Sequence, residues 1–167
     1  MMNIKLRRLN SSDYEKYLEL RLEGFKNQPM QFRFSPEDEV SLGKELISRK
    51  LESDYVIGAF YDNHLVGIGG LGVLFGSKLK HRALIWGMYV TKEFRSKGIS
   101  KLIVDSLVSQ ANLLHIESLL LTVVSENNVA MNLYEKSGFI QYAIDKNAVK
   151  NADGTSLDEV LMVKNLV

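Results

Sequence analysis

Residues 88–103 read MYVTKEFRSKGISKLI, and this stretch decides how the rest of the chain is interpreted. It begins in a β-rich run, Arg82–Thr91, and ends in apolar residues at helical spacing. The polar loop between them carries Arg95, Lys97 and Gly98. Free N–H groups at a helix N-terminus bind phosphate, and glycine lets the backbone approach a ligand closely. The stretch therefore predicts a phosphate or pyrophosphate site, with a basic surface turn as the alternative.

Hydrophobic periodicity and turn residues predict an alternating order of strands and helices along the whole chain. The predicted strands span residues 3–9, 55–61, 64–74, 82–91, 118–124, 139–145 and 157–167. The predicted helices span residues 13–27, 36–51, 99–114 and 127–136. A capping box is predicted at Ser12–Glu15 and a serine N-cap at Ser35, and the apolar run 118–124 is predicted to be a strand buried on both faces. The order indicates an α/β or α+β fold with a mixed sheet.

Composition excludes several classes of function. The chain has 167 residues, which predicts one domain over 1–167. Its 21 Lys and Arg against 20 Asp and Glu leave a net charge of +1, so we expect no nucleic-acid or membrane partner. The absence of cysteine excludes disulfides, a cysteine nucleophile and thiolate metal sites. No apolar run approaches the roughly 20 residues of a membrane span, so a cytoplasmic protein is expected.

Two segments resemble the signatures of one enzyme family. Residues 95–100, RSKGIS, resemble the (Gln/Arg)-x-x-Gly-x-(Gly/Ala) signature of the GNAT N-acetyltransferase superfamily, with Ser100 where Gly or Ala is usual. Residues 127–139, NNVAMNLYEKSGF, resemble the family's pattern N-x-x-A-x-x-L-Y-x-K-x-G-F at every fixed position. The resemblance covers residues 55–145 well. It implies a mixed, twisted sheet of about seven strands flanked by helices, and transfer of an acetyl group from acetyl-CoA without a metal.

The resemblance also implies a role for individual residues. The end of strand 84–91 would splay from strand 118–124, and Tyr134 would be the general acid that protonates the leaving CoA thiolate. A packed core tyrosine is the alternative for that residue. The residues implied to hold acetyl-CoA are Met88, Tyr89 and Val90 (acetyl carbonyl and pantetheine), Arg95, Ser96, Lys97, Gly98, Ile99 and Ser100 (pyrophosphate), Asn127 (pantetheine arm or order in the site) and Lys136 (3′-phosphate or surface charge).

The sequence defines the general base and the residues that bind the acetyl acceptor less closely than it defines the CoA-binding residues. Strand 83–90 has no carboxylate, so the candidate bases lie elsewhere: Glu126, the pair Asp158-Glu159, and Glu23. The resemblance places the acceptor pocket between the first two helices and the last hairpin, where it would contain Phe32, Phe34 and Trp86, with Arg21, Phe25, Arg33 and Tyr89. The acceptor would be a small-molecule or peptide amine, and the family allows a homodimer.

Other readings of the chain are weaker. Residues 67–72, GIGGLG, have dinucleotide-binding spacing, but strand and turn residues follow them instead of a helix. His64, His81 and His115 lack metal-ligand spacing, and the basic cluster 78–82 is typical of a solvated hairpin end. Two alternatives keep the CoA site: a non-catalytic acyl-CoA sensor or interaction module, and an acyltransferase with another acyl donor or a protein amine as acceptor.

Overall fold

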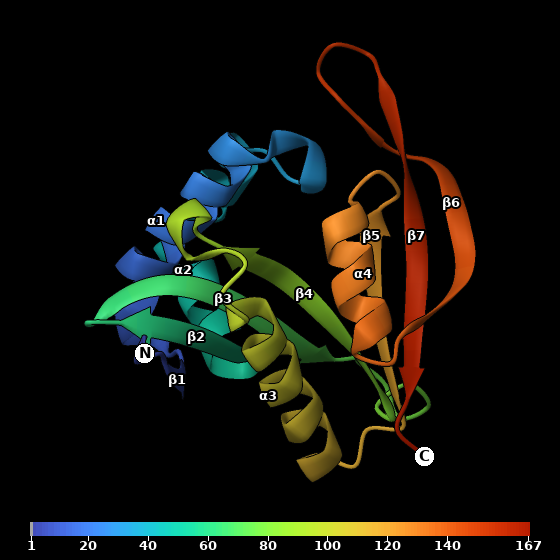
Figure 1. Ribbon diagram of the computed structural model, residues 1–167, viewed down its shortest axis with the longest axis horizontal. Helices are drawn as coiled ribbons and strands as arrows, with labels where there is room; N and C mark the ends of the chain where they lie inside the picture. Colours follow the sequence, from blue (N-terminus) through green and yellow to red (C-terminus); the bar gives the residue numbers. More distant parts are fainter. Residues whose placement is uncertain (1) are drawn as a thin grey trace.

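A computed structural model describes residues 2–167 as a single seven-stranded sheet with helices on both faces (Figure 1). The strand order is β1-β2-β3-β4-β5-β7-β6. The strands are β1 (Lys5–Arg8), β2 (Tyr55–Tyr61), β3 (His64–Val73), β4 (Arg82–Val90), β5 (Ser118–Val124), β6 (Ile140–Lys150) and β7 (Ser156–Asn165). Neighbouring strands are antiparallel except β4 and β5, which are parallel. The predicted mixed sheet of seven strands is confirmed.

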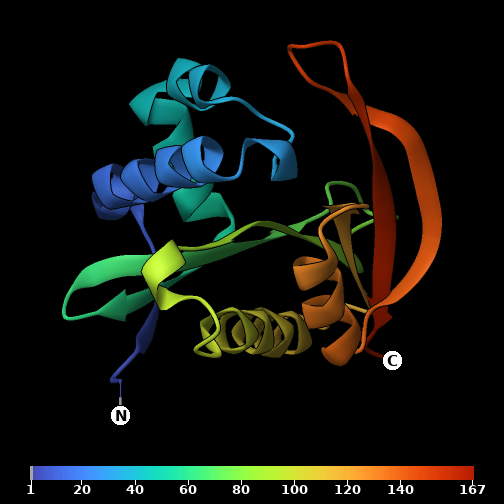
Figure 2. The same cartoon turned by 45° about the horizontal axis from the view of Figure 1, so that its top comes forward.

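Four α-helices and three 3-10 turns complete the fold. The helices are α1 (Tyr14–Asn27), α2 (Pro36–Ser53), α3 (Ile99–Leu113) and α4 (Asn128–Lys136). The 3-10 turns are η1 (Ser11–Asp13), η2 (Pro29–Gln31) and η3 (Lys92–Phe94). Helices α1 and α2 lie on one face of the sheet, and α3 and α4 lie on the other (Figure 2).

The two faces carry separate hydrophobic cores. Under α3 and α4, residues such as Ile103, Leu107 and Leu119 are fully buried against the strands. Under α1 and α2, Tyr17 and Leu20 pack on β2 and β3 in the second core. Both cores include residues of β4. Packing on both faces therefore holds β4 in place, so that groups on this strand can form a rigid binding site.

The sheet is split between β4 and β5. These strands pair only from Arg82–Ser118 to Leu84–Leu120, after which they diverge (Figure 1). The rest of β4 has no strand partner on that side. The predicted splay of the two central strands is thus confirmed.

Three local predictions differ from the structure. In strand β5, Leu119, Leu121 and Val123 are buried in the core under α3 and α4, whereas Ser118, Leu120 and Thr122 are only half-buried. The first capping box is formed by Asn10 and Asp13, which begin η1 before α1, instead of by Ser12 and Glu15. Helix α2 has the predicted Ser35 cap but is kinked at Gly43, where φ is +74°.

Candidate functional site

A bulge in β4 sets the geometry of the open split. Trp86 pairs with Gly70 and Tyr89 pairs with Ile68, so β4 has one extra residue over this interval. Gly87, inside the bulge, has φ +67°, which glycine adopts at little cost. The bulge shifts the alternation of β4, so that Tyr89 packs on the α1/α2 side. Trp86 and Tyr89 therefore lie on the side of α1 and α2, and Met88 and Val90 lie on the side of α3 and α4.

The loop after β4 leads into the N-terminus of α3. Ser96 and Gly98 both have left-handed backbones, with φ values of +59° and +78°. Gly98 is the N-cap of α3, and no side chain caps the first turn, which contains no acidic residue. A Cβ on Gly98 would meet nothing within 4 Å, so the backbone angle is the requirement here. The N–H groups of this first turn are available to an anion.

The predicted CoA residues of this loop differ in their exposure. Ser96, Lys97 and Gly98 are exposed, Ser100 is half-buried, and Ile99 is buried in the core under α3. The exposed and half-buried residues surround the free helix N-terminus. The buried Ile99 anchors the start of the helix in the core.

Arg95 turns back onto β4. Its Nε donates to the Val90 carbonyl at 2.9 Å, and its guanidinium lies over the Tyr89 ring at 5.5 Å. Its Nη2 is buried without a partner. Arg95 therefore contacts the last residues of β4 and stabilises the end of this strand. The motif spacing did not predict these contacts.

Helix α4 carries the second signature. Asn127 is its N-cap and accepts a hydrogen bond from the Ala130 N–H at 3.2 Å, which orders the start of the helix. Lys136, at the C-terminal end, is exposed. Met88 packs against the same core as α3 and α4.

Tyr134 lies in the core that joins the signature segments. It is 6% exposed, its ring packs edge-on against Phe139, and it shares one cluster with Val90 and Ile99. Burial alone raises the pKa of the Tyr134 phenol above its ordinary value. The phenol is consequently protonated at neutral pH, as a proton donor must be.

The predicted acceptor aromatics are separated. Phe32 packs against Phe25 and Tyr89, with ring centroids 4.9 and 6.2 Å apart. Phe34 is exposed. Trp86 faces the end of α2, with Lys50 Nζ 4.2 Å from its ring and a buried, unpaired indole N–H. Phe32 thus packs on the Tyr89 ring, and Trp86 lies against Lys50 of α2.

Two ion pairs hold the α1–α2 region. Arg21 of α1 donates from Nε and Nη2 to Glu39 of α2 at 3.2 Å each, and both residues are buried. Arg33, between α1 and α2, donates from the same two nitrogens to Glu159 of β7. Hydrogen bonding to Glu159 raises the pKa of Arg33, and the nearby Asp145 adds to this. The sequence showed no signal for Glu39, because its partner lies 18 residues away.

Most of the candidate bases have partners. Glu23 accepts from the Tyr89 hydroxyl at 2.8 Å and from Thr91. Glu159 is bound by Arg33 as described, and Asp158 accepts from Lys146 at 2.8 Å in the β6–β7 hairpin. Glu126 is exposed after β5. The structure singles out none of them as a base.

The comparisons with known proteins agree with this architecture. The model of the acetyltransferase (GNAT) family matches residues 14–139. The chain belongs to the GNAT acetyltransferase family. No curated protein matches this GNAT chain.

Solved structures share its fold. An acetyltransferase of the GNAT family from Streptococcus pneumoniae superposes with TM-score 0.88 at 19% identity, over 98% of this chain and 100% of that one. A probable acetyltransferase from Staphylococcus epidermidis gives 0.79 at 23%, over 100% of both chains. A putative acetyltransferase from Salmonella typhimurium, solved with its cofactor acetyl-CoA, gives 0.81 at 15%, over 99% and 95%.

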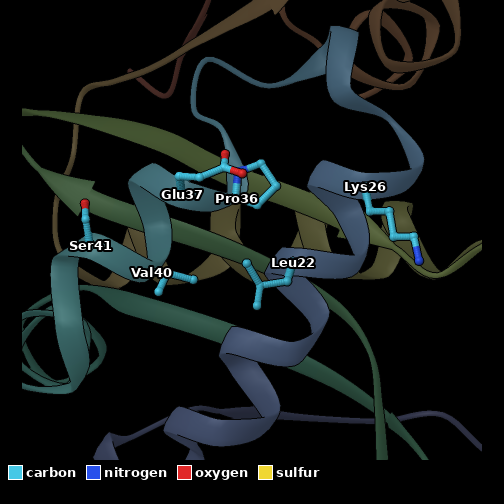
Figure 3. Close-up of a pocket in the computed structure, with 6 residues that line it drawn as sticks. All are labelled: Leu22, Lys26, Pro36, Glu37, Val40 and Ser41. Atoms are coloured by element: carbon cyan, nitrogen blue, oxygen red, sulfur yellow. The ribbon is translucent and has the colours of Figure 1, made fainter.

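Other features of this GNAT protein lie outside the split. The glycine-rich run 67–72 is part of β3, as its pattern indicated. A surface groove lies between α1 and α2, lined by Leu22, Lys26, Pro36, Glu37, Val40 and Ser41 (Figure 3). No strand residue lines this groove.

Within residues 2–167, no helix is long and apolar enough to cross a membrane, and no group of three side chains could ligate a metal.

Proposed function

We propose that this protein transfers the acetyl group of acetyl-CoA to a primary amine by direct attack of the amine. The observation that carries the proposal is the open edge of β4. Pairing with β5 stops at Leu84, and the loop that follows β4 ends at the uncapped N-terminus of α3. An extended acyl-pantetheine chain can pair with such an edge while its pyrophosphate reaches the helix N-terminus.

Each end of the bound cosubstrate then has partners. Backbone groups of Met88, Tyr89 and Val90 hold the acetyl carbonyl and the first pantetheine amides. One Val90 acceptor position is already taken by Arg95. The amides of residues 95–100 hold the pyrophosphate, with Lys97 supplying exposed positive charge. Asn127 orders the facing helix, and Lys136 is available to the 3′-phosphate.

The chemical step needs no covalent enzyme intermediate. The amine nitrogen attacks the thioester carbonyl carbon, the C–S bond breaks, and the amine loses one proton as the amide forms. The departing thiolate takes a proton from the Tyr134 hydroxyl. Burial keeps this phenol protonated, so the proton that the departing thiolate needs is present on Tyr134.

Thiol release from acetyl-CoA with a panel of primary amines tests this function. We expect Tyr134→Phe to lower kcat by about 10²–10⁴, the usual contribution of a general acid, and to leave acetyl-CoA affinity unchanged. Tyr142→Phe is the matched control, because Tyr142 is 53% exposed on β6. Normal turnover in Tyr134→Phe would exclude the general-acid role. Binding of acetyl-CoA without turnover of any amine would favour a sensor instead.

A further inference from the structure

The Arg21 guanidinium is buried, and among the described residues only the edge formed by Nε and Nη2 makes hydrogen bonds. Its side chain is 8% exposed, and Nε and Nη2 both donate to the Glu39 carboxylate. Its remaining nitrogen, Nη1, makes none of the side-chain hydrogen bonds within residues 2–167. It is also not one of the two buried unpaired nitrogens, which are those of Trp86 and Arg95. Nη1 is therefore still reached by solvent.

This free nitrogen lies at the β4 bulge. A Cβ placed on Gly87 would be 3.3 Å from Arg21 Nη1. Gly87 precedes Met88, whose backbone we assign to the acetyl carbonyl, and it lies beyond the last β4–β5 pair at Leu84. The two N–H groups of Nη1 are consequently beside the predicted reaction centre, on the α1/α2 side of the sheet.

The orientation of Arg21 is held from several directions. Its guanidinium carbon lies 4.7 Å from the centroid of the Phe25 ring and 5.9 Å from that of Phe32. The Glu39 fork fixes rotation about the side chain. A guanidinium fixed in this way loses little entropy when it binds a planar anion.

A purely structural role explains less of this arrangement. A buried ion pair adds little stability compared with apolar residues of similar size. If Arg21 only tied α1 to α2, the placement of its free Nη1 against the glycine of the bulge would serve no purpose. Arg33 shows the same mode of anchoring, with Nε and Nη2 on Glu159, at the loop next to Phe32.

We propose that the acceptor is an amine with a carboxylate close to its amino group, as in a free amino acid, and that Arg21 Nη1 donates to this carboxylate. The inference rests on the proposed acetyl transfer. A carboxylate is the anion whose planar shape fits guanidinium donors, and binding it at the bulge would place the neighbouring amine next to the thioester. Arg21 is thus a specificity-determining residue.

Matched pairs of acceptors test the proposal directly. Each of the common amino acids is compared with its carboxamide in the thiol-release assay, which removes the negative charge with little change of shape. We expect kcat/KM for the preferred free acid to exceed that of its amide by about 10-fold or more, the value of a charge-assisted hydrogen bond. Equal or better turnover of the amides would overturn the proposal.

Paired variants connect the preference to Arg21. In Arg21→Gln/Glu39→Gln both charges are removed together, which avoids an unpaired buried carboxylate. We expect the ratio of acid to amide kcat/KM to fall to near one while acetyl-CoA affinity is unchanged. The control is Arg49→Gln/Glu45→Gln, an exposed ion pair on α2. A preference that survives in the Arg21 variant would contradict the assignment.

A binding measurement on the unaltered protein covers the case in which this variant does not fold or no acceptor turns over. With CoA present, N-acetyl amino acids should bind at least about 10-fold more tightly than their carboxamides, for the same reason. Equal affinity would overturn the inference about the acceptor. Failure of the proposed function is a separate result: the protein would then either not bind acetyl-CoA or bind it without acetylating any primary amine.

Discussion

Arg33 and Glu159 form a bidentate ion pair that joins the two halves of the split sheet. Arg33 lies in the connection between α1 and α2, which cover the β1–β4 half, and Glu159 lies on β7 in the other half. The Glu159 side chain is 3% exposed and that of Arg33 is 53% exposed. The pair therefore ties the connection that carries Phe32 and Phe34 to β7.

Removing this ion pair should weaken acceptor binding. In Arg33→Gln/Glu159→Gln the connection loses its anchor on β7, and we expect the acceptor KM to rise by about 10-fold, as for one lost charge-assisted hydrogen bond. Acetyl-CoA affinity, measured by calorimetry, should not change. Arg49→Gln, on the exposed surface of α2, is the control. An unchanged acceptor KM would show that the anchor has no part in acceptor binding.

The left-handed backbone at Gly98 predicts a graded effect on acetyl-CoA binding. Gly98→Ala has space for its Cβ but must adopt φ +78°, which costs about 1–2 kcal/mol for an L-residue. We expect acetyl-CoA to bind about 5- to 30-fold more weakly, because the first turn of α3 reorients. Gly98→Asn should be affected less, since asparagine tolerates this conformation. If Gly98→Ala binds as the unaltered protein does, the loop is not the cradle.

The buried phenol of Tyr134 predicts how the proposed acetyl transfer depends on alkaline pH. Burial raises the pKa of this phenol, so it stays protonated beyond the ordinary tyrosine value of about 10. The profile of kcat against pH should therefore show no alkaline decline from loss of this proton up to about pH 10. A decline near pH 8–9 that disappears in Tyr134→Phe would contradict the raised pKa of this phenol.

Asp13 predicts a loss of stability in acid. Its carboxylate accepts from Arg7 at 2.7 and 2.8 Å and from the Asn10 N–H at 3.0 Å, and the hydrogen bonds from Arg7 are the largest cause of its lowered pKa. A lowered folded pKa stabilises the protein above the unfolded value of about 3.9, and this contribution disappears as pH falls through the folded pKa.

Urea unfolding of Asp13→Asn measures that contribution. At pH 7 the free energy of unfolding should be lower than that of the unaltered protein by roughly 1–3 kcal/mol. The difference should shrink as the pH falls below about 4. A difference that stays constant between pH 7 and pH 2 would show that the charge of Asp13 is unimportant.

Local sequence patterns predicted most of the elements, and they also carry the residues of the proposed CoA site. Glycine at 98, the apolar spacing after it and the signature around Tyr134 are each contained in one short segment. Their placement depends on the strand–loop–helix order, which hydrophobic periodicity shows well. The strands and helices were therefore predicted within a few residues, except that β6 runs to Lys150 instead of ending near 145.

The acceptor side could not be predicted in the same way. Arg33 and Glu159 are 126 residues apart, and Arg21 meets Glu39 only because α1 packs on α2. Single charged residues have no periodicity that indicates a partner. The positive φ of Gly87 also has no local signal, because its neighbours continue the pattern of a regular strand.

Calorimetric titration with acetyl-CoA tests the central claim most directly, with NAD and ATP as control ligands. The open β4 edge and the N-terminus of α3 predict micromolar binding of acetyl-CoA and much weaker binding of either control. Absence of acetyl-CoA binding, or equal affinity for all three ligands, would contradict the proposed acetyltransferase site.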